Sequence, residues 1–291
     1  MKLQKNLEIS VEFELKLTKT KINYLRTMNN WLTKFVFLIL ISTLFIGCTE
    51  DSEEEETTKN NQKIEPVEAI AKRFVESKLE IIPSEKYKLE IVKGQLDGDN
   101  QEDAVVTVNR YNYAVEKAGQ TKNPGKVAEI GYMGPYNYLF YYDGATGKMS
   151  GPMEIPSTPI SPLKVSFEKV MSDAFSDIVI TYRIRNSCFK HIYTIQNQKP
   201  RLVFGWKIFD GFGTPDAKAV HFVYETTAVS LPKDIRIMKA KIISSNEKQD
   251  YNVDEPKLEK LNEEEYRFFY NPKEGKYAIK VSDLKPQTDK P

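Results

Sequence analysis

Hydrophobic and polar residues recur along the chain with two periods, one typical of a helix and one typical of strands. In residues 63–79 the apolar positions follow helical spacing, which predicts one amphipathic helix. From Lys86 onward apolar and polar residues alternate in short runs, which predicts strands separated by turns. The predicted strands are residues 87–93, 104–108, 136–142, 149–155, 163–170, 177–184, 189–195, 201–208, 220–224, 235–243, 266–270 and 277–281.

Two of the connections between these strands carry clear turn signals. Gly and Asp in residues 143–148 predict a tight turn, and residues 271–275 predict a second hairpin. The charged residues 244–265 are expected to form a long loop. The fold class is therefore mainly β: a sandwich, an irregular barrel or an open propeller-like stack of about twelve strands, preceded by one helix.

One apolar segment, residues 35–47, does not fit this domain. It contains no charged residue and is shorter than the about 20 residues that a membrane-spanning helix needs. Lys34 precedes it and small residues end it, as in the apolar core of a secretory signal. A short membrane anchor or a buried core helix is the alternative.

The end of the segment, Phe45-Ile46-Gly47-Cys48, resembles the lipobox of bacterial lipoprotein signal peptides. Phe45 stands where that family usually has Leu. The resemblance implies that Cys48 is lipidated, for example with palmitate, and becomes the mature N-terminus. The partner of this end of the chain is then a membrane, since each buried methylene of an acyl chain contributes about 0.8 kcal/mol.

An acidic run, TEDSEEEE, follows Cys48 directly. Such a run repels itself and stays solvated. It resembles the acidic export tag of surface lipoproteins in some Gram-negative lineages, which implies an outer-membrane lipoprotein at the cell surface. A tether that faces the periplasm is the alternative.

These features divide the chain into three parts: a signal region (residues 1–47), a lipidated acidic tether (48–62) and a single β-rich domain with its N-terminal helix (63–291). Met28 begins an ordinary signal sequence, so we expect translation to start there and residues 1–27 to be an artefact of the assigned start.

Charge and cysteine content limit the classes of function that the sequence supports. The chain has 42 basic and 41 acidic residues, and no basic cluster suggests nucleic acid as a partner. If Cys48 is lipidated, Cys188 has no cysteine to pair with inside the chain. Cys188 is therefore expected to be a small packed side chain rather than a nucleophile.

The strongest motif of the domain is GQLDGDNQED, residues 94–103. Around a tight loop Asp97, Asp99 and Asp103 can converge their oxygens, as hard cations require. The motif resembles the calcium loops of FG-GAP/VCBS-type repeats, with Gln95 in place of the first Asp and Asn100 in place of the Gly. The resemblance implies a Ca²⁺ site at Gln95, Asp97, Asp99 and Asp103. A solvated turn without an ion is the alternative.

The remaining candidates are aromatic residues and histidines. Residues 132–142 form a dense aromatic cluster, and Trp206, Phe209 and Phe212 suggest a second aromatic patch on a loop. Either could stack on sugars or peptides, and sheet packing is the alternative. His191 and His221 lie in alternating strands without a ligand partner, so a structural role is expected for both.

Together these signals predict a lipid-anchored surface protein with a non-catalytic FG-GAP/VCBS-like binding or scaffold domain and an extracellular glycan or protein as its ligand. No nucleophile elbow or phosphate loop occurs in the sequence. The alternative is a secreted hydrolase or glycan-processing enzyme that uses an unrecognised pair of carboxylates.

Overall fold

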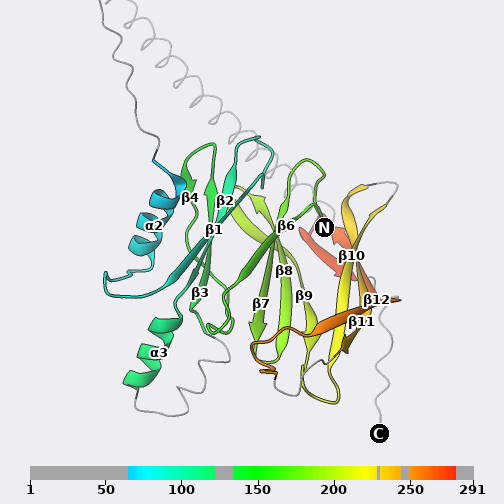
Figure 1. Ribbon diagram of the computed structural model, residues 1–291. Helices are drawn as coiled ribbons and strands as arrows, with labels where there is room; N and C mark the ends of the chain where they lie inside the picture. The colour runs from blue at the N-terminus through cyan, green and yellow to red at the C-terminus, as the bar shows by residue number, and fades with distance from the viewer. Residues whose placement is uncertain (1–64, 122–133, 228–229, 244–248, 280–291) are drawn as a thin grey trace, which may run out of the picture. The chain divides into compact units, whose positions relative to one another are not determined.

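Strands dominate the part of the chain that the computed structural model describes, residues 65–121, 134–227, 230–243 and 249–279 (Figure 1). These residues belong to one unit, Lys63–Pro291. Cys48 and the rest of the signal region and tether lie outside them. The elements are α2 (Val67–Lys78), β1 (Lys88–Gly94), β2 (Asp103–Asn109), α3 (Tyr111–Gln120), β3 (Asn137–Asp143), β4 (Lys148–Met149), β5 (Met153–Glu154), β6 (Lys164–Glu168), β7 (Asp177–Ile184), β8 (Ser187–Gln196), β9 (Lys199–Asp210), β10 (Lys218–Thr227), β11 (Ser230–Ile243), β12 (Lys257–Asn271) and β13 (Lys276–Ile279).

The strands form two antiparallel sheets. The smaller sheet has the order β1-β2-β3-β4, with β5 also paired to β3. The larger sheet runs β13-β12-β11-β10-β9-β8-β7-β6 and is open, since β13 does not pair with β6. The mainly β fold class is thus confirmed, and of the three predicted arrangements the sandwich-like one is observed.

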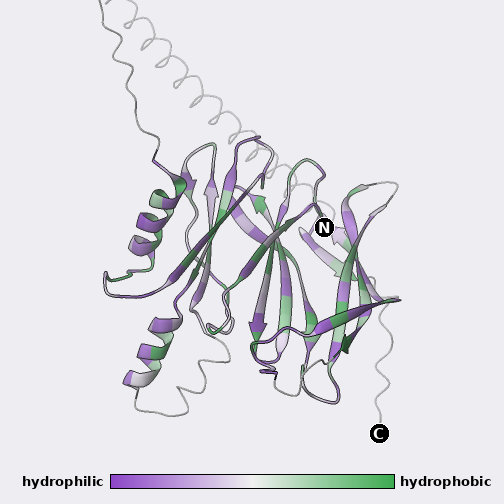
Figure 2. Cartoon of the chain, in the orientation of Figure 1, coloured by the Kyte–Doolittle hydropathy of each residue, from purple (hydrophilic) through white to green (hydrophobic). Residues whose placement is uncertain are grey.

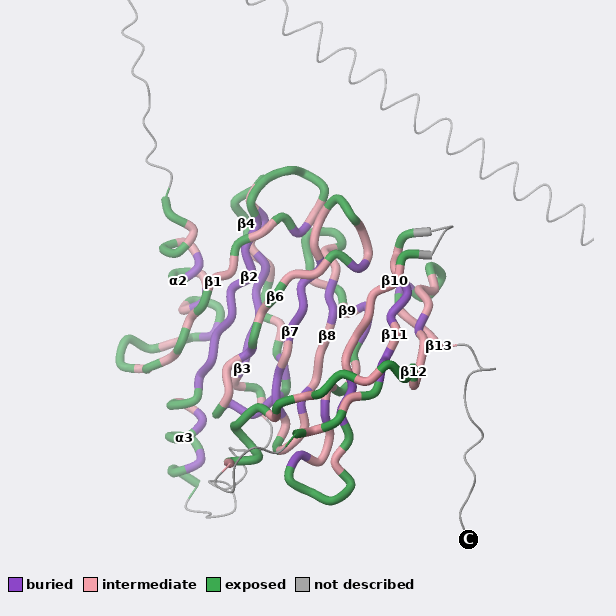
Figure 3. Tube along the Cα trace, turned by 45° about the vertical axis from the view of Figure 1, so that its right-hand side comes forward, coloured by how far each residue is buried: buried purple, intermediate pink, exposed green. Residues whose placement is uncertain are grey.

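Alternation along the strands gives the smaller sheet two buried faces. In β2, Val105 packs towards the larger sheet and Val106 towards α2. In β3, Tyr141 likewise packs towards the larger sheet and Phe140 towards α2. Figure 3 shows the consequence, since β2 is buried along its length while the outer side of α2 is exposed.

The second face of the larger sheet has a core of its own. Ile178 and Ile180 of β7 face the smaller sheet, whereas Val179 between them packs into a separate cluster with Phe204 and Phe268. The sheet curls around that cluster and brings β13 beside β9. Figure 2 shows the matching alternation of hydrophilic and hydrophobic residues along these strands.

Several local predictions are confirmed. The predicted helix is α2, and the two predicted turns join β3 to β4 and β12 to β13. Each of these turns contains a glycine with positive φ, Gly147 at +66° and Gly275 at +65°. These are conformations that glycine adopts without a steric penalty.

Two local predictions are wrong. A second helix, α3, follows β2; only Ala114 and Ala118 of it are buried, so its apolar stripe is too small to give a helical signal. The expected loop 244–265 is too long: residues 244–248 lie outside the described residues and 249–256 form turns, but β12 begins at Lys257, and its charged residues lie on an exposed face. None of the described helices is long and apolar enough to span a membrane.

Candidate functional site

The predicted calcium loop connects β1 to β2, and its side chains accept backbone hydrogen bonds. Asp97 Oδ1 accepts the Asp99 N–H at 3.0 Å, and Asp99 Oδ1 accepts the Gln101 N–H at 2.8 Å. These are successive Asx turns. Asn100 has φ +64°, the left-handed conformation expected of the residue in the glycine position. Gln95 is exposed.

Asp103 is fully buried and joins two loops. Its Oδ2 accepts the Leu96 N–H at 3.1 Å, and its Oδ1 accepts the Gly144 N–H at 3.0 Å. Tyr141 donates its hydroxyl to Asp97 Oδ2 at 3.2 Å. Burial raises the pKa of the Asp103 carboxyl, against the effect of its backbone hydrogen bonds.

The same arrangement occurs once more, between β6 and β7. Asp177 begins β7 as Asp103 begins β2, and its Oδ2 accepts the Val170 N–H at 2.9 Å, seven residues back, as Asp103 does with Leu96. Asp177 Oδ2 also accepts the Met171 N–H at 2.7 Å. Both aspartates therefore act as clamps that close a β-hairpin loop.

The described residues contain no group of three or more His, Cys, Asp or Glu side chains arranged to hold a metal ion. In the β1–β2 loop both oxygens of Asp103 and of Asp97 already accept hydrogen bonds. A hydrogen-bonded turn accounts for this geometry without an ion.

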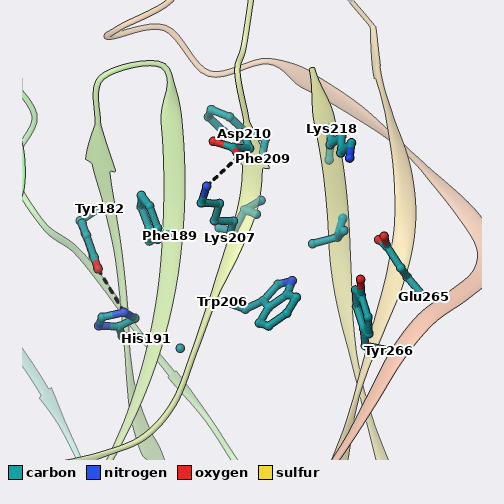
Figure 4. A pocket seen from close by; sticks show the side chains of 14 residues that line it. Tyr182, Phe189, His191, Trp206, Lys207, Phe209, Asp210, Lys218, Glu265 and Tyr266 are labelled. Atoms are coloured by element: carbon teal, nitrogen blue, oxygen red, sulfur yellow. Dashed lines mark hydrogen bonds and ion pairs between the residues drawn. The ribbon is translucent and has the colours of Figure 1, made fainter. Parts of the chain in front are cut away.

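A pocket of about 560 Å³ lies elsewhere, between β9 and β10 (Figure 4). Five strands of the larger sheet contribute to it: β7, β8, β9, β10 and β12. We call it the β9/β10 pocket. Its labelled lining residues in Figure 4 are Tyr182, Phe189, His191, Trp206, Lys207, Phe209, Asp210, Lys218, Glu265 and Tyr266.

The pocket exists because β9 and β10 separate. They pair only at Lys218↔Asp210 and Ala219↔Phe209, next to the turn that connects them. Beyond Ala219, β10 continues its pairing with β11, while β9 continues its pairing with β8. The two strands diverge, and side chains rather than a hydrogen-bond ladder occupy the space between them.

Aromatic side chains form the walls. The Trp206 ring lies 5.3 Å from the Tyr266 ring and 5.1 Å from the Phe268 ring, both edge to face. On the other side the Tyr182 and Phe189 rings stack at 5.3 Å. Flat rings of this kind offer contact area that loses little conformational entropy on binding.

His191 links the wall to the core. Its Nε2 lies 3.0 Å from the Tyr182 hydroxyl and its Nδ1 lies 3.2 Å from the Tyr193 hydroxyl. Burial lowers the pKa of His191, so the ring is neutral near pH 7. The contacts of His191 are those of a structural side chain, and its ring also lines the pocket.

Charged side chains form the rim. Lys207 Nζ donates to Asp210 Oδ2 at 2.6 Å, and Ser187 donates its hydroxyl to the other oxygen. The hydrogen bond from Lys207, with that from Ser187, holds the pKa of the Asp210 carboxyl below its ordinary value. Lys218 and Glu265 make no side-chain hydrogen bond or ion pair with any described residue.

The sequence indicated only part of this site. Trp206 and Phe209 belong to the predicted second aromatic patch, but they lie on strand β9 rather than on a loop. Glu265 was assigned to a loop and instead lies at an irregularity of β12, where Ile237↔Tyr266 and Met238↔Glu264 leave it unpaired in the ladder.

The other candidates pack in the core. Tyr138 and Phe140 of the first aromatic cluster lie against α2. Cys188 is buried, and burial raises the pKa of its thiol to about 12, so it is an unreactive packed side chain as predicted. His221 lies half-buried on β10, outside the pocket lining.

Comparison with known proteins found no match to a family model, a curated protein or a solved structure. The site is therefore interpreted from its own geometry.

Proposed function

We propose that this protein is a lipid-anchored binding protein of the outer membrane, exposed at the cell surface, and that the β9/β10 pocket is its ligand site. The observation that carries the proposal is the pocket itself. Its volume of about 560 Å³ lies within the range of small-ligand sites, roughly 300–1,000 Å³. Its aromatic walls and few charged groups are also typical of such sites.

The chemistry of the lining favours an amphipathic ligand. Trp206 and Tyr266 present apolar ring surface, while Lys218 and Glu265 offer one positive and one negative group without a hydrogen bond or ion pair among the described residues. A short section of glycan or peptide supplies both kinds of contact. The absence of a clustered basic face in the sequence argues against nucleic acid.

The alternative of a hydrolase has one supporting feature, since Asp210 and Glu265 place two carboxylates in the same pocket. A general acid for glycoside hydrolysis requires a raised pKa. Lys207 and Ser187 instead keep Asp210 ionised. This favours binding. Turnover of chromogenic glycosides or peptides that is lost in Asp210→Asn would reverse the preference.

Trp206 provides a direct test of binding. The chain has two tryptophans, Trp31 in the signal region and Trp206 in the pocket. Signal cleavage before Cys48 removes Trp31, so in the mature protein tryptophan fluorescence reports on the pocket alone. We expect a panel of oligosaccharides and peptides to contain ligands that shift this emission with saturation. A panel that leaves the emission unchanged, and whose heats of mixing equal those of a Trp206→Ala protein, would contradict the proposal.

The anchor is tested separately. We expect labelled palmitate to be incorporated into the wild-type protein and not into Cys48→Ala, and protease added to whole cells to remove the domain. Replacing the acidic residues 50–56 by Ser and Asn should retain the label but protect the domain from protease. Protection of the wild-type domain in intact cells would favour the periplasm-facing tether.

Calcium binding at Gln95, Asp97, Asp99 and Asp103 stays a separate proposal, supported by the motif and by the conformation of Asn100. We expect millimolar Ca²⁺ to raise the unfolding midpoint relative to EDTA, and an Asp97→Ala/Asp99→Ala protein to lose the difference. Equal midpoints in Ca²⁺ and EDTA would leave a turn held by hydrogen bonds.

A further inference from the structure

The pocket contains an unpaired strand edge. β9 pairs with β8 from Lys199 to Phe209, with irregularities at Val203 and Ile208, but on its other side it pairs with β10 only at Phe209 and Asp210. At the opposite end of β9, Arg201 donates to the Glu274 carbonyl at 3.0 Å, where the β12–β13 hairpin lies beside it. Val203 and Phe204 are buried in the core, where the Tyr277 ring of β13 packs on Phe204. Residues 205–208, which line the pocket, have no strand partner on this side among the described residues.

That edge presents backbone groups to the pocket. In an antiparallel strand every second residue directs both its N–H and its C=O to the same neighbour. Within residues 205–208 about two residues therefore direct both groups away from β8 and towards the gap. An exposed strand edge of this kind is a template for a further strand.

Gly205 lies in the middle of this stretch and is exposed. A Cβ at this position would come within 2.7 Å of the His191 ring, so the ring packs directly on the glycine backbone. Glycine inside a strand often marks a place where another backbone approaches closely. The His191 ring by itself accounts for a glycine here. The exposure of Gly205 shows that the β9 backbone is accessible at this point of the pocket.

The rim supplies charges for both ends of an incoming segment. Lys218 projects from β10 and Glu265 from β12, and neither has an ion-pair partner among the described residues (Figure 4). A ligand that carries one acidic and one basic group can neutralise both. The Trp206 and Tyr266 rings, 5.3 Å apart, line the same pocket.

We propose that the ligand is an extended peptide segment that adds as a strand to the free edge of β9. Its central aromatic or apolar side chain packs on Trp206 and Tyr266, an acidic residue faces Lys218, and a basic residue faces Glu265. This inference rests on the proposed binding function and specifies its ligand. A glycan can stack on the rings, but it lacks the alternating N–H and C=O groups that the edge requires.

The test uses the full chain in detergent and calorimetric titration. The probes are capped pentapeptides with a central Phe, Thr on each side of it, and Glu and Lys at the two ends in either order. We expect one order to bind more tightly than the other. The same peptide with alternate backbone amides N-methylated along one edge keeps its side chains but loses at least two backbone hydrogen bonds, so its affinity should fall at least about tenfold.

Charge exchange at the rim provides the matched control. Lys218→Glu/Glu265→Lys should reverse the preference between the two peptide orders. Lys148→Glu and Glu90→Lys, which change exposed residues of the smaller sheet, should leave the preference unchanged. Equal affinities of methylated and unmethylated peptides on both edges would overturn the strand-addition geometry.

These outcomes distinguish the inference of a peptide ligand from the proposed binding function on which it rests. If oligosaccharides of N-acetylglucosamine or glucose bind in a Trp206-dependent manner and no peptide of the panel does, the peptide inference is wrong and the binding function stands. If neither class binds, both are wrong.

Discussion

The smaller sheet with its helices and the β9–β12 part of the larger sheet differ in how their charged side chains are partnered. Around the smaller sheet, buried charges are paired: Arg110 donates to both oxygens of Glu85 at 2.6 Å, and both side chains are less than a tenth exposed. Around the β9/β10 pocket, Lys218 and Glu265 make no such pair. The difference separates groups that hold the fold from groups available to a ligand.

The backbone pairing of β2 and β9 differs in a corresponding way. β2 pairs with β1 over its whole length and with β3 from Ala104 to Asn109, and all of its residues are buried. β9 pairs with β8 on one side, with irregularities at Val203 and Ile208, and over two residues with β10 on the other. The ladders on its two sides satisfy the backbone groups of β2, whereas part of β9 has no strand partner on the side of β10.

The largest effect is expected at the Arg110–Glu85 pair. Glu85→Ala leaves a buried guanidinium without its carboxylate, which should lower the free energy of unfolding by about 3–5 kcal/mol, measured by urea denaturation. The double variant Arg110→Met/Glu85→Leu should recover most of that loss. A loss below about 1 kcal/mol in Glu85→Ala would show that the pair does not hold the domain.

The two aspartate clamps come next. Asp103→Ala and Asp177→Ala each leave two backbone N–H groups without their acceptor. Each should therefore lower the free energy of unfolding by about 2–4 kcal/mol. Asp→Asn at the same positions retains one acceptor and should cost less. If Asp103→Ala destabilises the protein only in the presence of Ca²⁺, Asp103 is a metal ligand rather than a clamp.

A smaller effect is expected from His191. Its folded pKa is lowered by burial from the ordinary 6.5, so the unfolded chain takes up the proton first. The stability it contributes is complete above pH 6.5 and is lost as pH falls through the lower folded pKa, with a slope of at most about 1.4 kcal/mol per pH unit.

Thermal midpoints between pH 8 and pH 5 measure this effect. The difference between wild type and His191→Gln should shrink as the pH falls, while His221→Gln serves as the control for the second histidine. A difference that is independent of pH would mean that His191 does not titrate in this range.

The smallest effects on stability are expected at the rim. Lys218→Ala and Glu265→Gln remove charges without partners, so each should change the free energy of unfolding by less than about 0.5 kcal/mol while weakening ligand binding. Lys207→Ala, which breaks the ion pair with Asp210, should cost up to about 1 kcal/mol. A large loss of stability in Lys218→Ala would make that side chain part of the fold instead.

Most elements could be predicted because their signals are local. The helical spacing of Val67 to Leu79 and the alternation of strands such as β7 depend only on neighbouring residues. Asp also stands ahead of an alternating β-branched run at both residues 103–108 and residues 177–182, and the shared clamp explains this similarity. The helix α3 was not predicted, because its only buried residues are two alanines, which give too weak an apolar periodicity.

The sequence by itself determined the β-rich class, the helix, the turns and the expectation of a lipid anchor at Cys48, because each follows from a short stretch of residues. Only the tertiary structure decided that β9 and β10 diverge and that Tyr182, Trp206 and Glu265 meet at one pocket. These residues lie on three strands far apart in the chain. An irregularity of the β12 ladder turns Glu265 towards them, and such a displacement depends on pairing partners that no local pattern contains.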